Sequence, residues 1–319
     1  MGGLRLVLFV VLVGGCGRSL PVDGRTRASA RYVAVGGSGR AVVSLDGLRW
    51  SDAPTGTDQS LLSVAAGAAR FVAVGAAGTI VASSDGMDWT TCVSGTKAEL
   101  RHVIFTGEKF LAVGGSWDTG AAMVESTDGE RWTVVSAPPN YQFRAVAQRA
   151  GTVIAAANYK SDLQTPALFT TSLSTGSAAG TWSQQLGPEF DDSVTVGDRI
   201  VVVGSSQAST SHDGLTWNSQ QLPTRNFVVP PDRAIAHSGQ LFVAVGQSGG
   251  FSSSPDGVRW TEAASTRSGG WLSGVAWGAP GGFVAVGAQG TIVTSPDGSV
   301  WSSQTLVPQI DLHDVAFGP

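Results

Sequence analysis

Six copies of one short pattern, Ser-x-Asp-Gly-x-x-Trp, set a hydroxyl beside a carboxylate, a pairing that could serve acid–base or nucleophilic chemistry. The aspartates of the six copies are Asp46, Asp85, Asp128, Asp213, Asp256 and Asp297. The tryptophans that close them are Trp50, Trp89, Trp132, Trp217, Trp260 and Trp301. A seventh tryptophan, Trp182, closes the degenerate copy "SLSTGSAAGTW", which has no aspartate. An enzyme needs one catalytic pair, so a pattern written this often predicts a repeated structural role.

Local chemistry supplies that role. The serine ends a strand, the aspartate accepts backbone N–H bonds from residues two or three further on, and the glycine takes a positive φ. The tryptophan buries its ring and has a local acceptor for its N–H. We call this unit the box, and we expect each box to hold a turn at the outer edge of the molecule.

The remaining residue types with catalytic potential are scattered. The four histidines, His102, His212, His237 and His313, show no metal-ligand spacing, so we expect no metal site and no cofactor. The glycine-rich strings near Gly36 and Gly75 lack the following lysine and helix of a phosphate-binding loop. Cys92 is expected to be a half-buried thiol on a strand. We therefore expect no catalytic residues and no enzymatic activity.

The elements that carry the boxes also repeat. The box tryptophans follow one another at intervals of 35 to 50 residues, and an apolar string of the form FVAVG precedes each box. A third string, Leu-x-x-Val-Ala, precedes most of these; we align LLSVA from Leu61, LSGVA from Leu272 and DDSVT from Asp191 with it. Short Val-, Ile- and Phe-rich runs between glycine-rich turns are typical of strands.

Four strands per repeat predict an all-β fold, a seven-bladed β-propeller of four-stranded blades. The first repeat lacks its Leu-x-x-Val-Ala strand, and the chain ends on "LHDVAFGP", Leu312–Pro319. We expect this C-terminal strand to pair into the first blade and close the ring. Whether the degenerate fourth repeat forms a full blade is left open.

The boxes resemble the Asp-box, or bacterial neuraminidase repeat, of sialidases and of photosystem II assembly factor-like propellers. The usual pattern has one more residue between the aspartate and the tryptophan. The resemblance covers nearly all of residues 31–319 and implies the propeller fold. The Arg-Ile-Pro stretch of sialidases is absent, and neither Tyr141 nor Tyr159 has a recognisable glutamate partner.

The N-terminus resembles that of a bacterial lipoprotein. Arg5 precedes the apolar run Leu6–Val13, which is shorter than the about 20 residues that a bilayer span needs. Val13-Gly14-Gly15-Cys16 resembles a lipobox, so we expect a signal peptide at 1–15, lipid attachment at Cys16 and a tether at 16–30. Lipidation of Cys16 would leave Cys92 without a disulfide partner. Gly17 in place of aspartate favours the outer membrane if the cell is Gram-negative.

Candidate binding residues lie where the repeat is interrupted. The longest loops run from Gly114 to Gly120 and from Asn158 to Pro166, with a long inter-blade link between them. They carry the candidate residues Trp117, Asp118, Tyr141, Tyr159, Lys160 and Asp162, and Trp271 opens another link. Aromatic side chains beside charges suit protein or carbohydrate contact.

The 20 basic and 24 acidic residues, without a basic run, exclude a nucleic-acid partner. We expect a monomeric, lipid-anchored protein of the cell envelope that is a non-catalytic binding or assembly platform for proteins or glycans. The alternative is an exported glycan-processing hydrolase with unrecognised catalytic residues.

Overall fold

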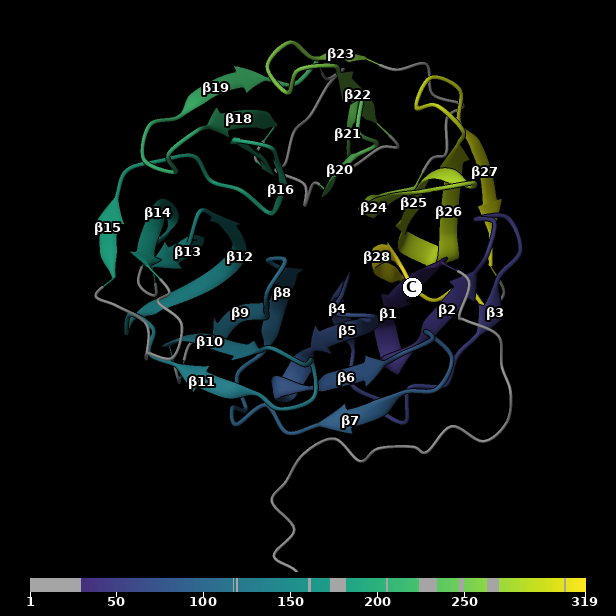
Figure 1. The fold of residues 1–319 in the computed structure, drawn as a ribbon, viewed down its shortest axis with the longest axis horizontal. Coiled ribbons are helices and arrows are strands. Elements are labelled where there is room, and N and C mark those ends of the chain that lie inside the picture. The colour runs from purple at the N-terminus through teal and green to yellow at the C-terminus, as the bar shows by residue number, and fades with distance from the viewer. Residues whose placement is uncertain are drawn as a thin grey trace, which may run out of the picture.

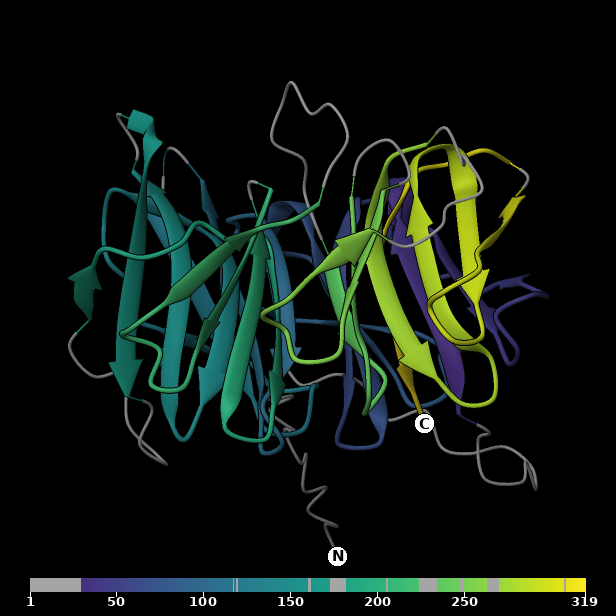
Figure 2. The same cartoon turned by 90° about the horizontal axis from the view of Figure 1, so that it is seen from above.

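The chain forms a closed ring of seven four-stranded antiparallel sheets, seen along its axis in Figure 1. This computed structural model describes residues 30–116, 118, 120–159, 162–172, 182–204, 206–223, 234–246, 250–262, 270–306 and 308–319. The strands of each blade run roughly along the ring axis (Figure 2). The predicted seven-bladed propeller is confirmed, and the fourth repeat forms a complete blade.

Each blade contributes one strand of each kind, counted outward from the axis. The innermost strands are β4 (Leu61–Gly67), β8 (Leu100–Phe105), β12 (Tyr141–Arg149), β16 (Asp192–Val196), β20 (Ala234–His237), β24 (Leu272–Gly278) and β28 (Leu312–Gly318). The second strands are β1 (Arg31–Gly36), β5 (Arg70–Gly75), β9 (Phe110–Ser116), β13 (Thr152–Tyr159), β17 (Arg199–Gly204), β21 (Phe242–Val245) and β25 (Gly282–Gly287).

The third strands are β2 (Ala41–Ser44), β6 (Ile80–Ser83), β10 (Gly120–Ser126), β14 (Asp162–Ser172), β18 (Gln207–Ser211), β22 (Phe251–Ser254) and β26 (Thr291–Ser295). The outer strands are β3 (Ser51–Asp52), β7 (Thr90–Cys92), β11 (Thr133–Val135), β15 (Ser183–Gln185), β19 (Asn218–Gln221), β23 (Thr261–Glu262) and β27 (Ser302–Thr305). Single turns of 3-10 helix stand at η1 (Gly37–Gly39), η2 (Ala76–Gly78) and η4 (Ala288–Gly290). In the described part of the chain, no helix is long and apolar enough to cross a membrane.

The core lies between blades. The middle positions of the second strands are apolar because a neighbouring sheet covers each of their faces. In β5, the residues Phe71 to Val74 have no exposed surface. They pack on one side with Val33 and Val35 of the preceding blade and on the other with Leu100 and Phe110 of the next. Full burial of one such side chain contributes about 1.5–3 kcal/mol.

The chain's two ends complete one blade, as predicted. β28 is the innermost strand of the sheet that continues with β1, β2 and β3. Its register with β1 runs from Arg31 opposite Gly318 to Gly36 opposite Leu312. This pairing leaves no gap in the ring.

One part of the predicted strand alignment is wrong. Asp192 pairs with Val203 in the way that Ser63 pairs with Val74 in the second blade. The alignment of DDSVT from Asp191 is therefore displaced by one residue. The buried anchor that corresponds to Leu61 is Phe190, which is fully buried.

Candidate functional site

The loops predicted to bind a partner lie at one face of the ring. On three adjacent strands of the fourth blade, Tyr141 is opposite Tyr159, which is opposite Asp162. Asp118 is exposed in the turn between β9 and β10. Trp117 and Lys160 lie outside the described residues, and of Tyr159 and Asp162 only the backbone is described.

Two of these loops are neighbours. A Cβ atom added to Gly120, at the end of the turn with Asp118, would lie 3.4 Å from the backbone N of Asn140 in the inter-blade link. Tyr141, the first residue of β12 after that link, donates its hydroxyl hydrogen to Gln184 Oε1 at 3.1 Å, and its ring meets Phe169 edge-on with the ring centroids 4.6 Å apart. The side chain of Tyr141 therefore makes contacts within its own blade. Trp271, on another blade, is 61% exposed.

The boxes form the same turn in blade after blade. In the first, Gly47 N–H donates to Ser44 Oγ at 2.8 Å, and the N–H groups of Leu48 and Arg49 donate to Asp46 Oδ1 at 2.9 and 2.8 Å. Trp50 Nε1 donates to Gly47 O at 3.0 Å. The glycine has a φ between +72° and +83° at Gly47, Gly86, Gly129, Gly214, Gly257 and Gly298.

The hydrogen bonds stabilise the charged form of the box carboxylates. The N–H of Arg49 is the largest influence on Asp46 and lowers its pKa to about 2. At Asp85, burial raises the pKa, but the N–H groups of Asp88 and Met87 outweigh it and the pKa is lowered. Two tryptophans depart from the pattern: Trp182 Nε1 donates to Ser136 O at 2.7 Å, and the buried Trp217 Nε1 has no partner.

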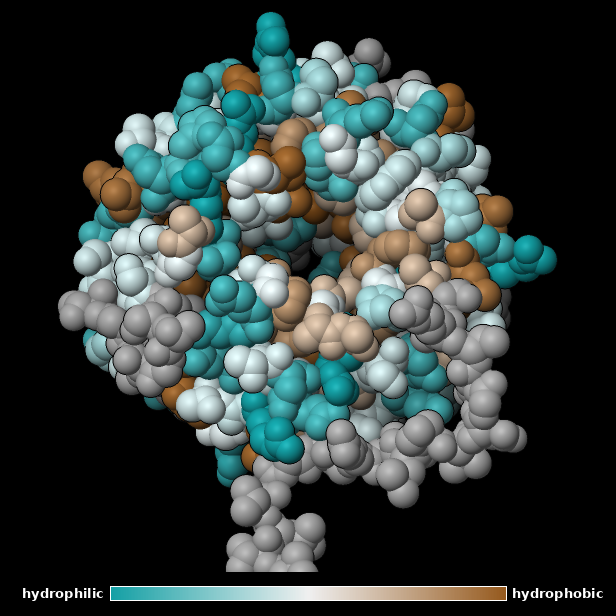
Figure 3. Space-filling view, in the orientation of Figure 1, coloured by the Kyte–Doolittle hydropathy of each residue, from teal (hydrophilic) through white to brown (hydrophobic). Residues whose placement is uncertain are grey.

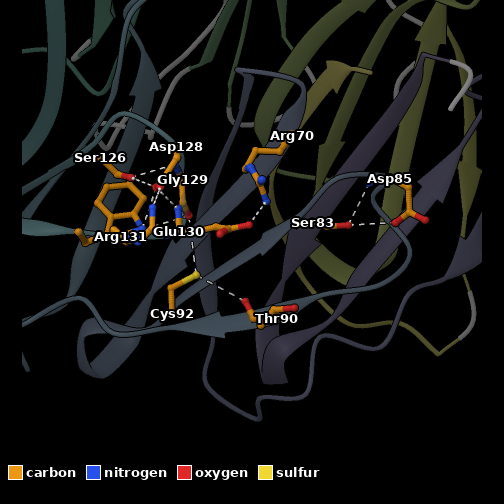
Figure 4. A network of polar contacts seen from close by, with 11 residues as sticks. Arg70, Ser83, Asp85, Thr90, Cys92, Ser126, Asp128, Gly129, Glu130 and Arg131 are labelled. Atoms are coloured by element: carbon orange, nitrogen blue, oxygen red, sulfur yellow. Dashed lines mark hydrogen bonds and ion pairs between the residues drawn. The ribbon is translucent and has the colours of Figure 1, made fainter. Parts of the chain in front are cut away.

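Figure 4 shows how a box fastens neighbouring blades. Arg70 of the second blade forms a 3.0 Å ion pair with Glu130 in the box of the third (Figure 4). The Cys92 sulfur lies 3.7 Å from Gly129 O of the same box. Cys92, which was expected to be half-buried, is a buried residue of β7. All these contacts lie between blades, at a distance from the ring axis.

The ring axis is the more enclosed site. A central cavity of about 650 Å³ lies between the innermost strands, and the surface is hollowed at the centre of the ring (Figure 3). It reaches the turns at Gly107, Ala150 and Gly197, which join innermost to second strands. The loops of the predicted binding patch join second to third strands, at the other end of each second strand. The cavity mouth and the predicted patch therefore belong to opposite faces.

Four polar side chains stand at one structurally equivalent position around this cavity. The strand registers align Ser63, His102, Asp192 and Asp314 with one another, each opposite the fourth residue of the FVAVG string. The other three blades have Ala145, Ala234 and Gly274 at this position. We call the four polar residues the channel ring.

The channel ring joins four of the seven blades to the blade that follows. Val64 N–H donates to Asp314 Oδ2 at 2.9 Å across the first blade boundary. Val103 N–H donates to Ser63 Oγ at 3.2 Å across the second. Val146 N–H donates to His102 Nδ1 at 3.2 Å across the third. The innermost strands have one free edge, and these side chains bind its N–H groups as a further strand would.

Both aspartates bind two N–H groups because the blade before each offers no acceptor. Asp192 Oδ1 accepts from Ser193 N–H at 2.7 Å, and its Oδ2 accepts from Ile235 N–H of the next blade at 2.9 Å. Asp314 repeats this with Val315 N–H at 2.7 Å and with Val64. The preceding blades have Ala145 and Gly274 there, which lack polar side chains.

The hydrogen bonds of His102 define its tautomer. Nδ1 accepts from Val146 N–H, so this nitrogen carries no proton. Nε2 lies 3.2 Å from Asp192 Oδ1 and donates to it. The imidazole is therefore neutral while both bonds are made, and neither nitrogen is available as a base.

The floor of the cavity is acidic. Asp192 and Asp314 both line it, and burial, followed by the charge of Asp192, raises the pKa of Asp314 to about 6. The nearby cation Arg144 forms ion pairs with Glu189 and Asp191. Among the residues that the structure describes, no group of three or more His, Cys, Asp or Glu side chains is arranged to hold a metal ion.

The channel ring was not among the residues predicted from the sequence. The available signal was a polar residue at the third position of Leu-x-x-Val-Ala, where other repeats have alanine or glycine. It is visible at Ser63, His102 and Asp314. At Asp192 this signal was hidden because DDSVT was aligned one residue too far along the chain.

No protein-family profile matches the chain, and no curated protein matches its sequence. Solved structures with the same fold include YCF48 bound to D1 peptide, with 16% identity, a TM-score of 0.56, and coverage of 93% of this chain and 88% of that one. The WD40 β-propeller domain of Doa1 has 15% identity and a TM-score of 0.55, with coverage of 81% and 86%. Streptogramin B lyase has 10% identity and a TM-score of 0.64, with coverage of 80% and 86%. These similarities establish a propeller fold that binding proteins and an enzyme share.

Proposed function

We propose that this protein is an exported, lipid-anchored binding or assembly platform of the bacterial cell envelope that performs no catalysis of its own. One observation carries the non-catalytic part. The enclosed cavity has a histidine, but both of its nitrogens are engaged in holding blades together. The site has a shape for binding, and its histidine is not available as a base.

The partner class in this proposal is protein or glycan. Support comes from the fold, which covers 93% of this chain in the match with YCF48 bound to D1 peptide. The exposed Asp118 and Trp271 are further contact candidates on the opposite face from the cavity mouth.

The experiment is in vivo crosslinking in native membranes, followed by affinity capture of the full chain, run beside a glycan array. Recovery of one specific partner, reduced by Trp271→Ala or by Asp118→Ala, supports the platform. Turnover of a glycan by the purified chain would overturn its non-catalytic character.

The anchor in this proposal is a lipid on Cys16, and the box repeats belong to the Asp-box type. Intact mass measurement of the membrane-extracted protein should give a chain that begins at Cys16 with added acyl mass. Cys16→Ser should move the protein out of the membrane fraction. An unlipidated chain in which Cys16 and Cys92 are joined would contradict the anchor.

A glycan hydrolase is the second candidate, and one observation favours it. Asp192 and Asp314 both line the cavity, and burial, followed by the charge of Asp192, raises the pKa of Asp314 to about 6. A carboxylic acid beside a carboxylate is the pair that glycosidases use. Cleavage of fluorogenic glycosides, lost in Asp314→Asn, would establish this candidate in place of the first.

A further inference from the structure

We propose that the central cavity binds an alkylammonium or guanidinium group on an apolar stem, with the charged end between Asp192 and Asp314. This inference rests on the proposed binding function and names the chemistry of its ligand. Four features of the cavity carry it: its walls, the charge of its floor, the engagement of nearby cations, and an unpartnered donor near its mouth.

The apolar part of the wall suits an apolar stem, and polar residues such as Thr106 and Gln148 complete the lining. Val103, Ile104 and Phe105 of β8 line the cavity together with Val194 of β16 and Val275 of β24. With about 650 Å³, the cavity is large enough for a ligand of small-molecule size. A methylene chain that enters from the face of the ring where the turns at Gly107, Ala150 and Gly197 lie would pass these side chains before it reaches the floor.

The floor has negative charge, and among the described residues neither aspartate forms an ion pair with a lysine or arginine. Arg149, the one such cation in the described lining, stands near the mouth and donates to His212 O. His102 is neutral in its bonded tautomer, as shown above, so it balances neither Asp192 nor Asp314. Arg144 is paired with Glu189 and Asp191. An ammonium or guanidinium between the two carboxylates would supply the missing charge, and in a site of low dielectric such a pairing is strong.

Holding the blades together does not by itself require this charge at every boundary. Ser63 and His102 bind the N–H groups of Val103 and Val146 without a net charge. Asp314 does the same work with a charge that burial and the charge of Asp192 disfavour, which is why its pKa is raised. A bound cation would offset that cost.

A donor near the mouth suits the polar end of the same ligand. Arg149 lines the cavity, and one of its terminal nitrogens donates to His212 O. Its Nε is buried and has no hydrogen-bond partner. A carbonyl oxygen beside the apolar stem, as in a lysine residue of a peptide, would satisfy it.

Calorimetric titration of the full chain at pH 7.5 tests the inference with three probes. The first is the peptide acetyl-Gly-Lys-Gly-amide, and the second is its norleucine analogue, which keeps the stem and loses the charge. The third is 1,5-diaminopentane, which separates a free amine from a peptide side chain. We expect the lysine peptide to bind at least tenfold more tightly than the norleucine peptide.

Matched variants locate the site. Asp192→Asn and Asp314→Asn should each weaken lysine-peptide binding tenfold or more. Asp198→Asn makes the same charge change at a 77% exposed side chain on the same face and should leave the affinity unchanged. Thermal melts identify any variant that does not fold.

The wild-type protein provides a second measurement that needs no variant. Lowering the pH from 7.5 to 5 protonates a carboxylate of pKa about 6. The affinity for the lysine peptide should fall by about tenfold, while a lysine ammonium keeps its charge throughout.

Equal binding of the lysine and norleucine peptides, or no binding of any amine probe at millimolar concentration, would overturn the inference. A partner captured from membranes that binds the Asp192 and Asp314 variants as well as the wild type would overturn it too. That last result would leave the proposed platform function intact, so the two failures are distinguishable.

Discussion

At the scale of single residues, the same carboxylate chemistry serves two opposite electrostatic situations. The box aspartates receive backbone N–H groups at the surface, and the pKa of Asp46 is lowered to about 2. Asp314 also receives N–H groups, but it lies at the axis beside Asp192, and its pKa is raised to about 6. The surroundings of an aspartate, and not its residue type, decide whether its pKa is raised or lowered.

Removal of one box carboxylate should destabilise the ring measurably. In Asp85→Ala, the N–H groups of Met87 and Asp88, now 2.9 and 3.0 Å from the carboxylate, lose their acceptor. We expect a loss of about 1–2 kcal/mol in the free energy of unfolding, measured by chemical denaturation. Asp88→Ala, at the exposed next-but-two position, is the control and should change little. Equal stability of the two variants would show that the box bonds do not stabilise the fold.

The pH dependence of the free energy of unfolding should reflect both the raised pKa of Asp314 and the lowered pKa of Asp46. The folded pKa of Asp314 is raised to about 6 from 3.8, so its folded form takes up a proton first, and stability should rise as pH falls from about 6.5 to 4. The folded pKa of Asp46 is lowered from 3.8 to about 2, so its contribution is lost as pH falls through that range. Melting temperatures from pH 8 to 2 should therefore peak between about 4 and 5. A monotonic fall from pH 7 would contradict the raised pKa of Asp314.

At the scale of elements, the box turn is also a packing unit between sheets. A Cβ at Gly86 would lie 2.6 Å from Val33 Cγ2 of the preceding blade. Equivalent glycines meet Ile154 and Val201 of other second strands. The box glycine is therefore constrained twice: its positive φ favours glycine, and a side chain of the preceding blade leaves no room for a Cβ atom.

A pair of glycine substitutions separates those two constraints. Gly86 and Gly56 have φ values of +72° and +75°, but nothing lies within 4 Å of a Cβ at Gly56. Gly56→Ala should lose about 1 kcal/mol of stability from backbone strain alone. Gly86→Ala should lose about 3 kcal/mol, because the valine must also move. Equal losses in denaturant titrations would mean that the blades adjust to the added methyl group without cost.

The closing strand should be indispensable. Deletion of Leu312–Pro319 removes β28, exposes the edge of β1 and takes away Asp314 with its bonds to the second blade. We expect an aggregating, protease-sensitive protein, followed by light scattering and limited proteolysis. Deletion of Pro319 alone is the control. A monomeric deletion variant with an unchanged melting temperature would refute the closure.

At the scale of the whole molecule, the sequence predicted the ring but not its cavity. The repeat of boxes and FVAVG strings gave the blade number and the closure, because every blade repeats the same local physics. The channel ring arises where the repeat is allowed to vary. Asp192 and Asp314 line the same cavity only because seven sheets close into a ring, and a displacement of one residue at Asp191 was enough to hide their equivalence. The predicted loop patch was found from its length, which is a local property, and its side chains at Tyr159 and Asp162 are not described.

The sheet that joins the chain's ends also determines how the ring would bear a mechanical load. Any force that reaches the propeller through the residues before Arg31 enters at β1, which is hydrogen-bonded to β28 on one side and to β2 on the other. Pulling along β1 shears both ladders at once instead of peeling them one bond at a time. Pulling β1 out of the ring would require the ladders to β2 and to β28 to break together, so the protein would resist tension through the same pairs that keep it circular.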